Sequence, residues 1–201
     1  MNQELISFGS PNATHRIVLL HGYGATSDDL VPLGEQILEK SSKAIQIALI
    51  QGHESLESGF GRQWYPLFPP DWSKVPLAID HLRKRLQRLS INSIPITRTC
   101  LMGFSQGGAM AIDAGSGLPF AGLIGCSAYP HPDWIPLETI SSVLLIHGRQ
   151  DEVVPYKASQ LLYNLLKAKK HKTELISFDG GHEIPKDIIP KLISFTNSIF
   201  I

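Results

Sequence analysis

Short apolar runs alternate along the chain with longer stretches whose hydrophobic residues recur at helical spacing. Most of the short runs lack a polar residue at every second position, which is typical of strands buried on both faces of a parallel sheet. The predicted strands are Arg16 to Leu20, Ala44 to Ile50, Thr99 to Gly103, Ala121 to Ala128, Ser142 to His147 and Thr173 to Phe178. An earlier run, Glu4 to Phe8, is predicted to form an antiparallel edge strand through a turn over Gly9 to Thr14.

The stretches between these strands predict helices. One carries Leu30, Leu33, Ile37 and Leu38, a second carries Ile79, Leu82, Leu86 and Leu89, and three more are predicted over Gly107 to Ala114, Pro155 to Ala168 and Pro185 to Phe200. Strands that alternate with helices predict an α/β fold, with a mostly parallel central sheet and helices on both faces. The length of 201 residues fits one domain that spans the whole chain.

One segment, Gln51 to Lys74, departs from the alternation. It is rich in Gly and Pro and carries the aromatic residues Phe60, Trp64, Tyr65, Phe68 and Trp72. Long loops in compact proteins are often functional. Two interpretations stay open: a surface loop whose aromatic residues pack locally, or a wall or lid over an apolar substrate.

Charge and composition narrow the class of partner. The 18 Lys and Arg residues balance 18 Asp and Glu residues, so the chain lacks the positive field that recruits nucleic acid or an anionic membrane. Cys100 and Cys126 lie in strand-like runs and are expected to be reduced core thiols. No signal-peptide pattern and no apolar stretch of membrane-spanning length is found. The sequence therefore predicts a cytoplasmic protein, not embedded in a membrane, that acts on a small molecule.

Residues Gly103 to Gly107 read Gly-Phe-Ser-Gln-Gly, the pattern of a nucleophile elbow. A predicted strand leads into it and a predicted helix leads out, which is the context that this motif needs. The nucleophile of such an elbow sits in a strained turn, and the flanking glycines let the turn approach neighbouring backbone without a Cβ clash. Ser105 is therefore the predicted nucleophile.

A serine hydroxyl needs an adjacent base, and a histidine base needs an acid to fix its tautomer. His182, in the Gly-Gly-His-Glu sequence after the last predicted strand, is the predicted base. Asp151, in the loop after the strand that ends at His147, is the predicted acid, with Glu152 and Asp179 in reserve. The chain order Ser, Asp, His is that of the α/β hydrolases and differs from the chymotrypsin and subtilisin orders.

The tetrahedral intermediate of acyl transfer needs N–H donors for its oxyanion. In α/β hydrolases one donor is the amide of the residue after the nucleophile, and the other comes from the loop after an early strand. Gln106 is the first of these. The segment His21 to Ala25, which reads His-Gly-Tyr-Gly-Ala, supplies the loop, and the amide of Tyr23 is the expected second donor.

Together these segments resemble the phospholipase/carboxylesterase family of the α/β hydrolases, which includes acyl-protein thioesterases. The resemblance covers essentially the whole chain. Its carriers are His21 to Gly24, Arg62 to Tyr65, Gly103 to Gly108, His147 to Pro155 and Gly181-His182. Gln106 after the nucleophile and the Asp-x-Val-Val-Pro run are more specific than the elbow alone.

The resemblance implies an α/β-hydrolase fold with an eight-stranded type of sheet and no large cap domain. It also implies hydrolysis of carboxylic esters or acyl thioesters without a metal or organic cofactor. Ser105, Asp151 and His182 fall on the family's triad positions, and Tyr23 and Gln106 fall on its oxyanion positions.

The family's substrate-side loop corresponds to the aromatic segment, so Trp64, Tyr65 and Phe68 are the predicted substrate-binding residues. The chain departs from the family at Pro66, where an acidic residue is common, and in the loop Tyr129 to Pro132. Both differences lie in substrate-facing loops, so the acyl preference stays open while the reaction type does not change.

The predicted function is a serine hydrolase that works through a covalent acyl-enzyme. A lysophospholipase or a peptidase of the same fold is an open alternative, and a non-catalytic ligand-binding protein is the alternative from another class. Nucleotide binding and zinc chemistry are disfavoured because neither a phosphate-binding glycine pattern nor metal-spaced His and Cys pairs occur. The expected partner is a small ester or thioester, an acylated protein or a lysophospholipid, and the protein is expected to be a monomer or a homodimer.

Overall fold

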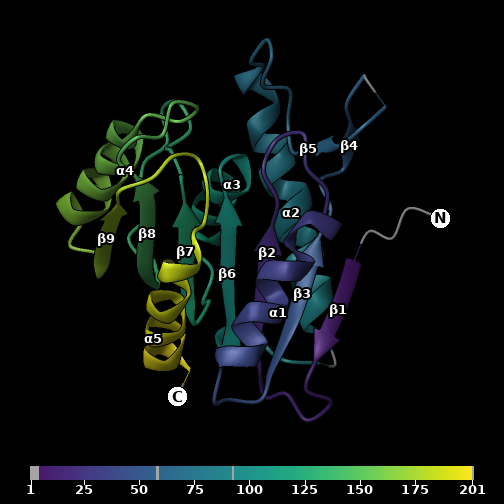
Figure 1. Cartoon of the computed structure of the whole chain (residues 1–201). Helices are drawn as coiled ribbons and strands as arrows, with labels where there is room; N and C mark the ends of the chain where they lie inside the picture. The colour runs from purple at the N-terminus through teal and green to yellow at the C-terminus, as the bar shows by residue number, and fades with distance from the viewer. Residues whose placement is uncertain (1–4, 58, 92, 201) are drawn as a thin grey trace.

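A seven-stranded sheet forms the centre of the computed structural model, which describes residues 5–57, 59–91 and 93–200 (Figure 1). In spatial order the strands are β1 (Leu5–Gly9), β3 (Ile45–Ile50), β2 (His15–Leu20), β6 (Thr99–Phe104), β7 (Gly122–Cys126), β8 (Ser142–Gly148) and β9 (Thr173–Phe178). The predicted α/β fold with a mostly parallel central sheet is confirmed.

The strand directions place several loops at the same edge of the sheet. β1 pairs antiparallel with β3, which confirms the predicted edge strand from Leu5 onward, while its predicted first residue, Glu4, lies outside the described residues. The other strands are parallel, so the segments after β2, β6, β7, β8 and β9 meet along the same carboxyl edge. The resemblance implied an eight-stranded type of sheet, whereas the described residues place seven strands in it.

Helices cover both faces of the sheet, as predicted. In Figure 1, α1 (Val31–Lys40) and α5 (Ile189–Ile199) lie in front, and α2 (Val75–Ser90), α3 (Gln106–Gly115) and α4 (Tyr156–Ala168) pack on the opposite face. The short 3-10 turns are η1 (Asp28–Leu30), η2 (Trp72–Lys74), η3 (Ile96–Arg98) and η4 (Lys186–Ile188). α2 begins one turn before Ile79, with Pro76 in its first turn, where the missing N–H costs no hydrogen bond.

Successive residues of the central strands enter two separate cores. Val18 and Leu20 pack with α2, α3 and α4, whereas Ile17 and Leu19 pack with α1 and α5. None of these four side chains is more than 1% exposed. Burial on both faces explains why the strand sequences are apolar without alternation.

The aromatic segment of residues 51–74 contains regular structure that the sequence did not predict. It holds a hairpin of β4 (Glu54–Ser55) and β5 (Arg62–Gln63), which stands above the carboxyl edge in Figure 1. The Gly24 N–H donates to Arg62 O and the Arg62 N–H donates to Ala25 O, both over 2.9 Å. This backbone pair fastens the hairpin to the loop after β2.

A buried arginine connects the start of β2 to the end of α2 and the segment that follows it. Arg16 is 1% exposed, and its Nε donates to Oε1 of Gln46 over 2.7 Å. Its Nη1 donates to the carbonyls of Leu89 and Ile94 over 3.2 Å each, and its Nη2 donates to the Ser93 hydroxyl over 2.7 Å. Burial lowers the pKa of the guanidinium. The four hydrogen bonds replace the water that this charge has lost.

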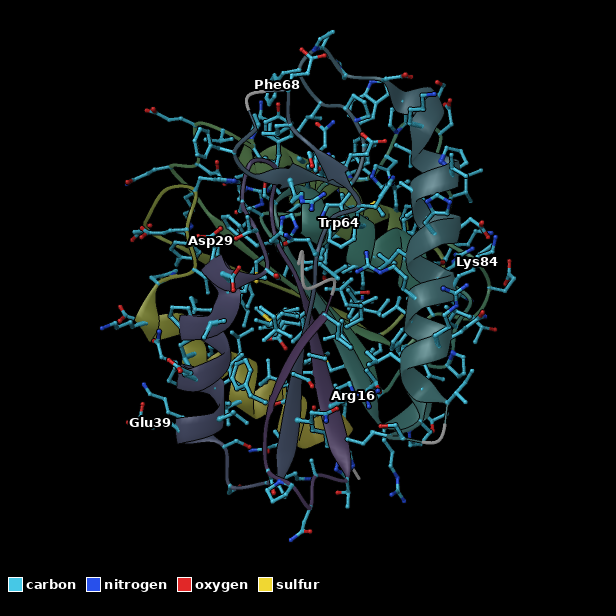
Figure 2. The ribbon with its side chains drawn as sticks, turned by 90° about the vertical axis from the view of Figure 1, so that its right-hand side faces the viewer. Arg16, Asp29, Glu39, Trp64, Phe68 and Lys84 are labelled. Atoms are coloured by element: carbon cyan, nitrogen blue, oxygen red, sulfur yellow. The ribbon has the colours of Figure 1, made fainter. Side chains whose placement is uncertain are left out.

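Replacing Arg16 with methionine is expected to lower the free energy of unfolding by about 2–4 kcal/mol, because four partly buried hydrogen bonds to its guanidinium are lost. Lys84→Met is the matched control. Figure 2 shows Lys84 on the outer side of α2, where it pairs with Asp80 over 2.6 Å, whereas Arg16 lies inside beside the strands. The control should leave the urea midpoint unchanged, since solvated ion pairs contribute little. Equal midpoints for the two variants would contradict the expected role of Arg16.

Candidate active site

Ser105 lies at the turn from β6 to α3. Its backbone has φ 55° and ψ −119°, a conformation that is strained for a residue with a Cβ. Its N–H donates to the carbonyl of Cys126 in β7 over 2.8 Å, and the residue is 8% exposed. The strained turn predicted by the elbow pattern is therefore present.

Two glycines make this turn possible. A Cβ added to Gly103 would lie 2.0 Å from the carbonyl oxygen of Gly107. A Cβ added to Gly107 would lie 2.3 Å from the carbonyl oxygen of Leu20 in β2. Because both neighbours are backbone atoms, no side-chain movement relieves such a contact, and only glycine fits at either position.

Asp151 and His182 come from the loops after β8 and β9. Nδ1 of His182 lies 2.7 Å from Oδ2 of Asp151, which is 7% exposed. A carboxylate only accepts, so Nδ1 carries the proton and Nε2 is the acceptor nitrogen of the neutral ring. The ring of Phe104, the residue before Ser105, lies against this imidazole with centroids 4.7 Å apart. The pair therefore sits directly beside the elbow.

Four further groups surround the Asp151 carboxylate. Oδ1 accepts the N–H groups of Val153 and Val154 over 2.9 and 2.8 Å. Oδ2 accepts the Ser127 hydroxyl over 3.0 Å and lies 3.2 Å from Nε2 of His147. The carboxylate is thus fixed from β7, from β8 and from its own loop.

The electrostatics favour an ionised Asp151. Burial opposes its ionisation, but the hydrogen bonds to it, led by that of His182, outweigh burial and hold the pKa of this carboxyl below its ordinary value. The reserve candidates lie elsewhere: Glu152 is exposed, and the side chain of Asp179 is 80% exposed and 3.5 Å from Arg149. Of the three carboxylates, Asp151 is the one that contacts His182.

The two predicted oxyanion donors, Gln106 and Tyr23, belong to the two segments that meet at Ser105. Gln106 is the first residue of α3 and follows Ser105 directly. Tyr23 follows Gly22, where an added Cβ would lie only 3.3 Å from the Cβ of Ser105. The loop after β2 therefore passes beside the serine.

A buried histidine holds that loop. His21 is 0% exposed, its Nδ1 lies 2.7 Å from the Gly22 carbonyl, and its Nε2 accepts the Gly52 N–H over 2.8 Å. The carbonyl only accepts, so Nδ1 carries the proton. Burial lowers the pKa of His21, which agrees with a neutral ring whose Nε2 accepts. The histidine of the His-Gly-Tyr-Gly motif thus shapes the turn that carries Tyr23.

Trp64 and Tyr65 are placed differently from the sequence prediction of substrate contact. They are 1% and 0% exposed and lie among the core residues, not among those that border the cavity beside Ser105. Figure 2 shows Trp64 inside the molecule, below Phe68. Nε1 of Trp64 donates to the His21 carbonyl over 2.9 Å. Local packing of the aromatic segment therefore describes these two residues.

The side chain of Gln106 connects the same two residues to the elbow. Its Oε1 accepts the Trp64 N–H over 3.1 Å, and its Nε2 donates to the Tyr65 carbonyl over 2.8 Å. Because Gln106 is 0% exposed, these bonds satisfy its buried amide. Gln106, the residue after Ser105, therefore also anchors the segment that forms one wall of the cavity beside Ser105.

A cavity of about 520 Å³ opens at Ser105. It is bordered by Tyr23, Leu67, Phe68, Pro70, Trp72, Ser105, Tyr129, Val153, Val154, Pro155, Ala158 and His182. Phe68, the third predicted substrate-binding residue, is 73% exposed at this cavity, and its ring meets that of Tyr23 edge-on at 5.1 Å between centroids. The apolar lining suits a hydrophobic group bound next to the serine.

A family model described as Phospholipase/Carboxylesterase matches residues 1–200. The chain belongs to the phospholipase/carboxylesterase family. The resemblance predicted from the motifs is confirmed, and the protein is an ester-cleaving hydrolase.

Two proteins of similar sequence are named as acyl-protein thioesterases. Acyl-protein thioesterase 1 of Neurospora crassa is 24% identical over 200 residues, which cover 84% of this chain and 80% of that protein. Acyl-protein thioesterase 1 homolog 1 of Dictyostelium discoideum is 25% identical over 205 residues, which cover 90% of this chain and 89% of that protein.

Solved structures agree with the fold. Esterase PE8 superposes with a TM-score of 0.85 at 27% identity, over 97% of both chains. The Bacillus cereus carboxylesterase superposes with a TM-score of 0.83 over 98% of this chain and 94% of that chain. At 18% identity, this similarity supports the fold alone.

Several residues at the cavity of this phospholipase/carboxylesterase were not singled out as site residues in the sequence: Leu67, Pro70, Tyr129, Val153, Val154, Pro155 and Ala158. Val153 to Pro155 follow Asp151, the predicted acid, in the same sequence run, so their position after it was a usable signal. Tyr129 lies in the loop that departs from the family. Ser127, which contacts Asp151, belongs to no motif.

Among residues 5–57, 59–91 and 93–200, no group of three His, Cys, Asp or Glu side chains is placed to hold a metal ion. Cys100 and Cys126 are free and buried, and burial raises the pKa of Cys126 to about 12. Within the same residues, no helix has the length and apolar character to cross a membrane.

Proposed function

We propose that this hydrolase cleaves carboxylic esters or acyl thioesters through an acyl-enzyme, with Ser105 as nucleophile, His182 as base and Asp151 as acid. The observation that carries the proposal is that Ser105 and His182 border one cavity while Asp151 holds His182 over 2.7 Å. The strained turn at Ser105 and the tautomer that Asp151 sets on His182 both support these roles.

In the first step Nε2 of His182 takes the hydroxyl proton as Oγ of Ser105 attacks the carbonyl carbon. The π electrons of the carbonyl move to its oxygen, where the backbone N–H groups of Tyr23 and Gln106 stabilise the negative charge. The N-terminus of the ten-residue helix α3 adds a favourable dipole at this point.

The imidazolium then gives its proton to the leaving oxygen or sulfur, and the bond from that atom to the acyl carbon breaks. Water repeats the attack on the acyl-enzyme, with His182 again as base, and releases the carboxylic acid and Ser105. No further reactant is needed, which suits a site built from this chain's own residues.

The cavity supports an apolar acyl group as the part of the substrate next to Ser105. Its lining is mainly aliphatic and aromatic, and its volume of about 520 Å³ leaves room for a hydrocarbon chain. The relatives named as acyl-protein thioesterases favour a thioester among the substrates. A lysophospholipid or a peptide is the alternative substrate of the same site, and a cytoplasmic place for the reaction stays a prediction of the sequence.

Labelling with a fluorophosphonate probe, which reacts with activated serines, tests the proposal. We expect labelling at Ser105 together with hydrolysis of acyl esters and acyl thioesters. Lysophospholipid and peptide substrates assayed in parallel identify the alternative substrate classes. A well-folded protein that neither takes the label nor turns over any ester would contradict the proposed triad and favour the ligand-binding alternative.

Replacing Phe68 with alanine is expected to lower kcat/KM for long-chain acyl esters by about tenfold, since a large apolar contact is lost. Acetyl esters should be hydrolysed as before, because a two-carbon acyl group has little apolar surface to bury against an aromatic ring. Phe60→Ala is the matched control, since Phe60 is 85% exposed and is not among the residues that border the cavity. An equal loss for every chain length would count against an acyl pocket at Phe68.

A further inference from the structure

Ser127, which the mechanism above does not use, has an unusual backbone. It follows β7, is 1% exposed and has φ 48°. A side chain in this region strains the backbone, and glycine occupies it without cost. This strained residue contacts Asp151. Backbone strain is concentrated at functional sites, so the contact points to a role in the reaction.

Ser127 lies between the elbow and the acid. β7 is the strand between β6, which leads to Ser105, and β8, which leads to Asp151. The residue before it, Cys126, accepts the Ser105 N–H over 2.8 Å. The hydroxyl of Ser127 donates to Oδ2 of Asp151 over 3.0 Å. Two adjacent residues therefore fix the backbone of the nucleophile and the side chain of the acid.

Oδ2 of Asp151 is the same oxygen that contacts His182. His147 approaches it from β8, with Nε2 3.2 Å from Oδ2 and 2.8 Å from the Val154 carbonyl. Both of these neighbours only accept, so Nε2 of His147 carries a proton and donates. The Ser127 hydroxyl therefore hydrogen-bonds Oδ2 and the His147 N–H lies 3.2 Å from it, so both groups favour the orientation in which Oδ2 contacts His182.

We propose that Ser127 is a positioning residue of the reaction: its hydroxyl holds Oδ2 of Asp151 so that His182 stays aligned with Ser105. This inference rests on the proposed function. Ser127 does not border the cavity, so its effect passes through Asp151 and not through contact with substrate.

Ser127→Gly separates this role from a structural one. The change removes the hydroxyl, and it also relieves the strain of φ 48°, so the folded state loses a hydrogen bond and gains an unstrained backbone. We expect kcat, expressed per folded molecule, to fall by about tenfold while KM changes by less than about twofold. Ser127→Ala, which removes the hydroxyl and keeps the strain, should show the same loss of kcat.

Lys170→Gly is the matched control. Lys170 is exposed, has φ 59° and follows the end of α4, before β9 begins, away from the carboxyl edge of the sheet. Glycine relieves the same kind of strain there without removing a contact to Asp151. The control should keep the kcat, the KM and the pH profile of the wild type.

The pH dependence of kcat/KM separates this role from a general loss of rigidity, which would not shift the acid limb. Without the Ser127 donor, Oδ2 becomes more basic and attracts the imidazolium of His182 more strongly, so the acid limb of kcat/KM should shift to higher pH. The titratable groups that face Asp151 are His182 and His147. His182 also borders a second cavity, whose charged lining residues are Asp29, Glu183 and Lys186. All of them are unchanged in both variants.

A Ser127→Gly protein with wild-type kcat, or with an unmoved acid limb, overturns the inference. The proposed function fails separately, when wild-type protein neither labels nor hydrolyses esters. Wild-type labelling and turnover with an unaltered Ser127→Gly variant would leave the triad standing and remove only the role of Ser127.

Discussion

Replacing Ser105 with alanine is expected to lower kcat for ester hydrolysis by about four to six powers of ten and to abolish fluorophosphonate labelling. The variant lacks the atom that forms the acyl-enzyme, and the oxyanion donors that remain supply only a small part of the acceleration. Alanine at φ 55° is strained as serine is, so the fold should persist. Steady-state hydrolysis of a short acyl ester, with circular dichroism to verify folding, measures the effect.

The control for this variant is Ser198→Ala. Ser198 is exposed on α5, where its hydroxyl donates to the Phe195 carbonyl within the helix, and its loss should leave turnover unchanged. Folded Ser105→Ala protein that retains a substantial share of wild-type turnover would show that another group attacks the substrate.

Replacing Asp151 with asparagine is expected to lower kcat by about four powers of ten. An amide has one acceptor oxygen, whereas the carboxylate accepts on both sides. Oδ1 faces two backbone N–H groups, of Val153 and Val154, which cannot turn away. The amide oxygen therefore stays on that side, and its NH₂ group faces His182. The NH₂ donates to Nδ1 and moves the imidazole proton to Nε2, where the ring can no longer accept from Ser105.

Asp179→Asn is the matched control, since Asp179 is the reserve candidate and its side chain is 80% exposed. It should keep wild-type kcat and the wild-type pH profile. The kcat values of the two variants decide between Asp151 and Asp179 as the acid. Unfolding followed by fluorescence verifies that the two variants are equally stable. A large loss in Asp179→Asn with an active Asp151→Asn variant would transfer the acid role to Asp179.

Local sequence patterns were enough to predict the elbow, because its motif is contiguous in the chain. The glycines at 103 and 107 allow backbone contacts that no other residue permits, and the apolar run before Ser105 forms a strand that is buried on both faces. The chain order of Ser105, Asp151 and His182 then followed from strand and helix alternation. These features needed no knowledge of distant contacts.

The aromatic segment shows where this reasoning stops. Trp64 and Phe68 are four positions apart and both aromatic, yet one is 1% exposed and the other 73% exposed. Trp64 is drawn inward by the His21 carbonyl and by the Gln106 amide, which come from other parts of the chain. Composition and spacing describe only a segment's neighbours along the chain, so they do not predict hydrogen bonds to His21 and Gln106.

The sequence by itself determined the α/β fold class, the strained serine after β6 and the family to which the chain belongs, since each depends on short-range pattern or on motifs. Only the tertiary structure decided which carboxylate contacts His182, which aromatic residues border the cavity, and that Ser127 reaches Asp151. The physical reason is that parallel strands bring loops far apart in the chain to one edge of the sheet. Hydrogen bonds of about 3 Å between those loops depend on how the helices and strands pack, which no local pattern encodes.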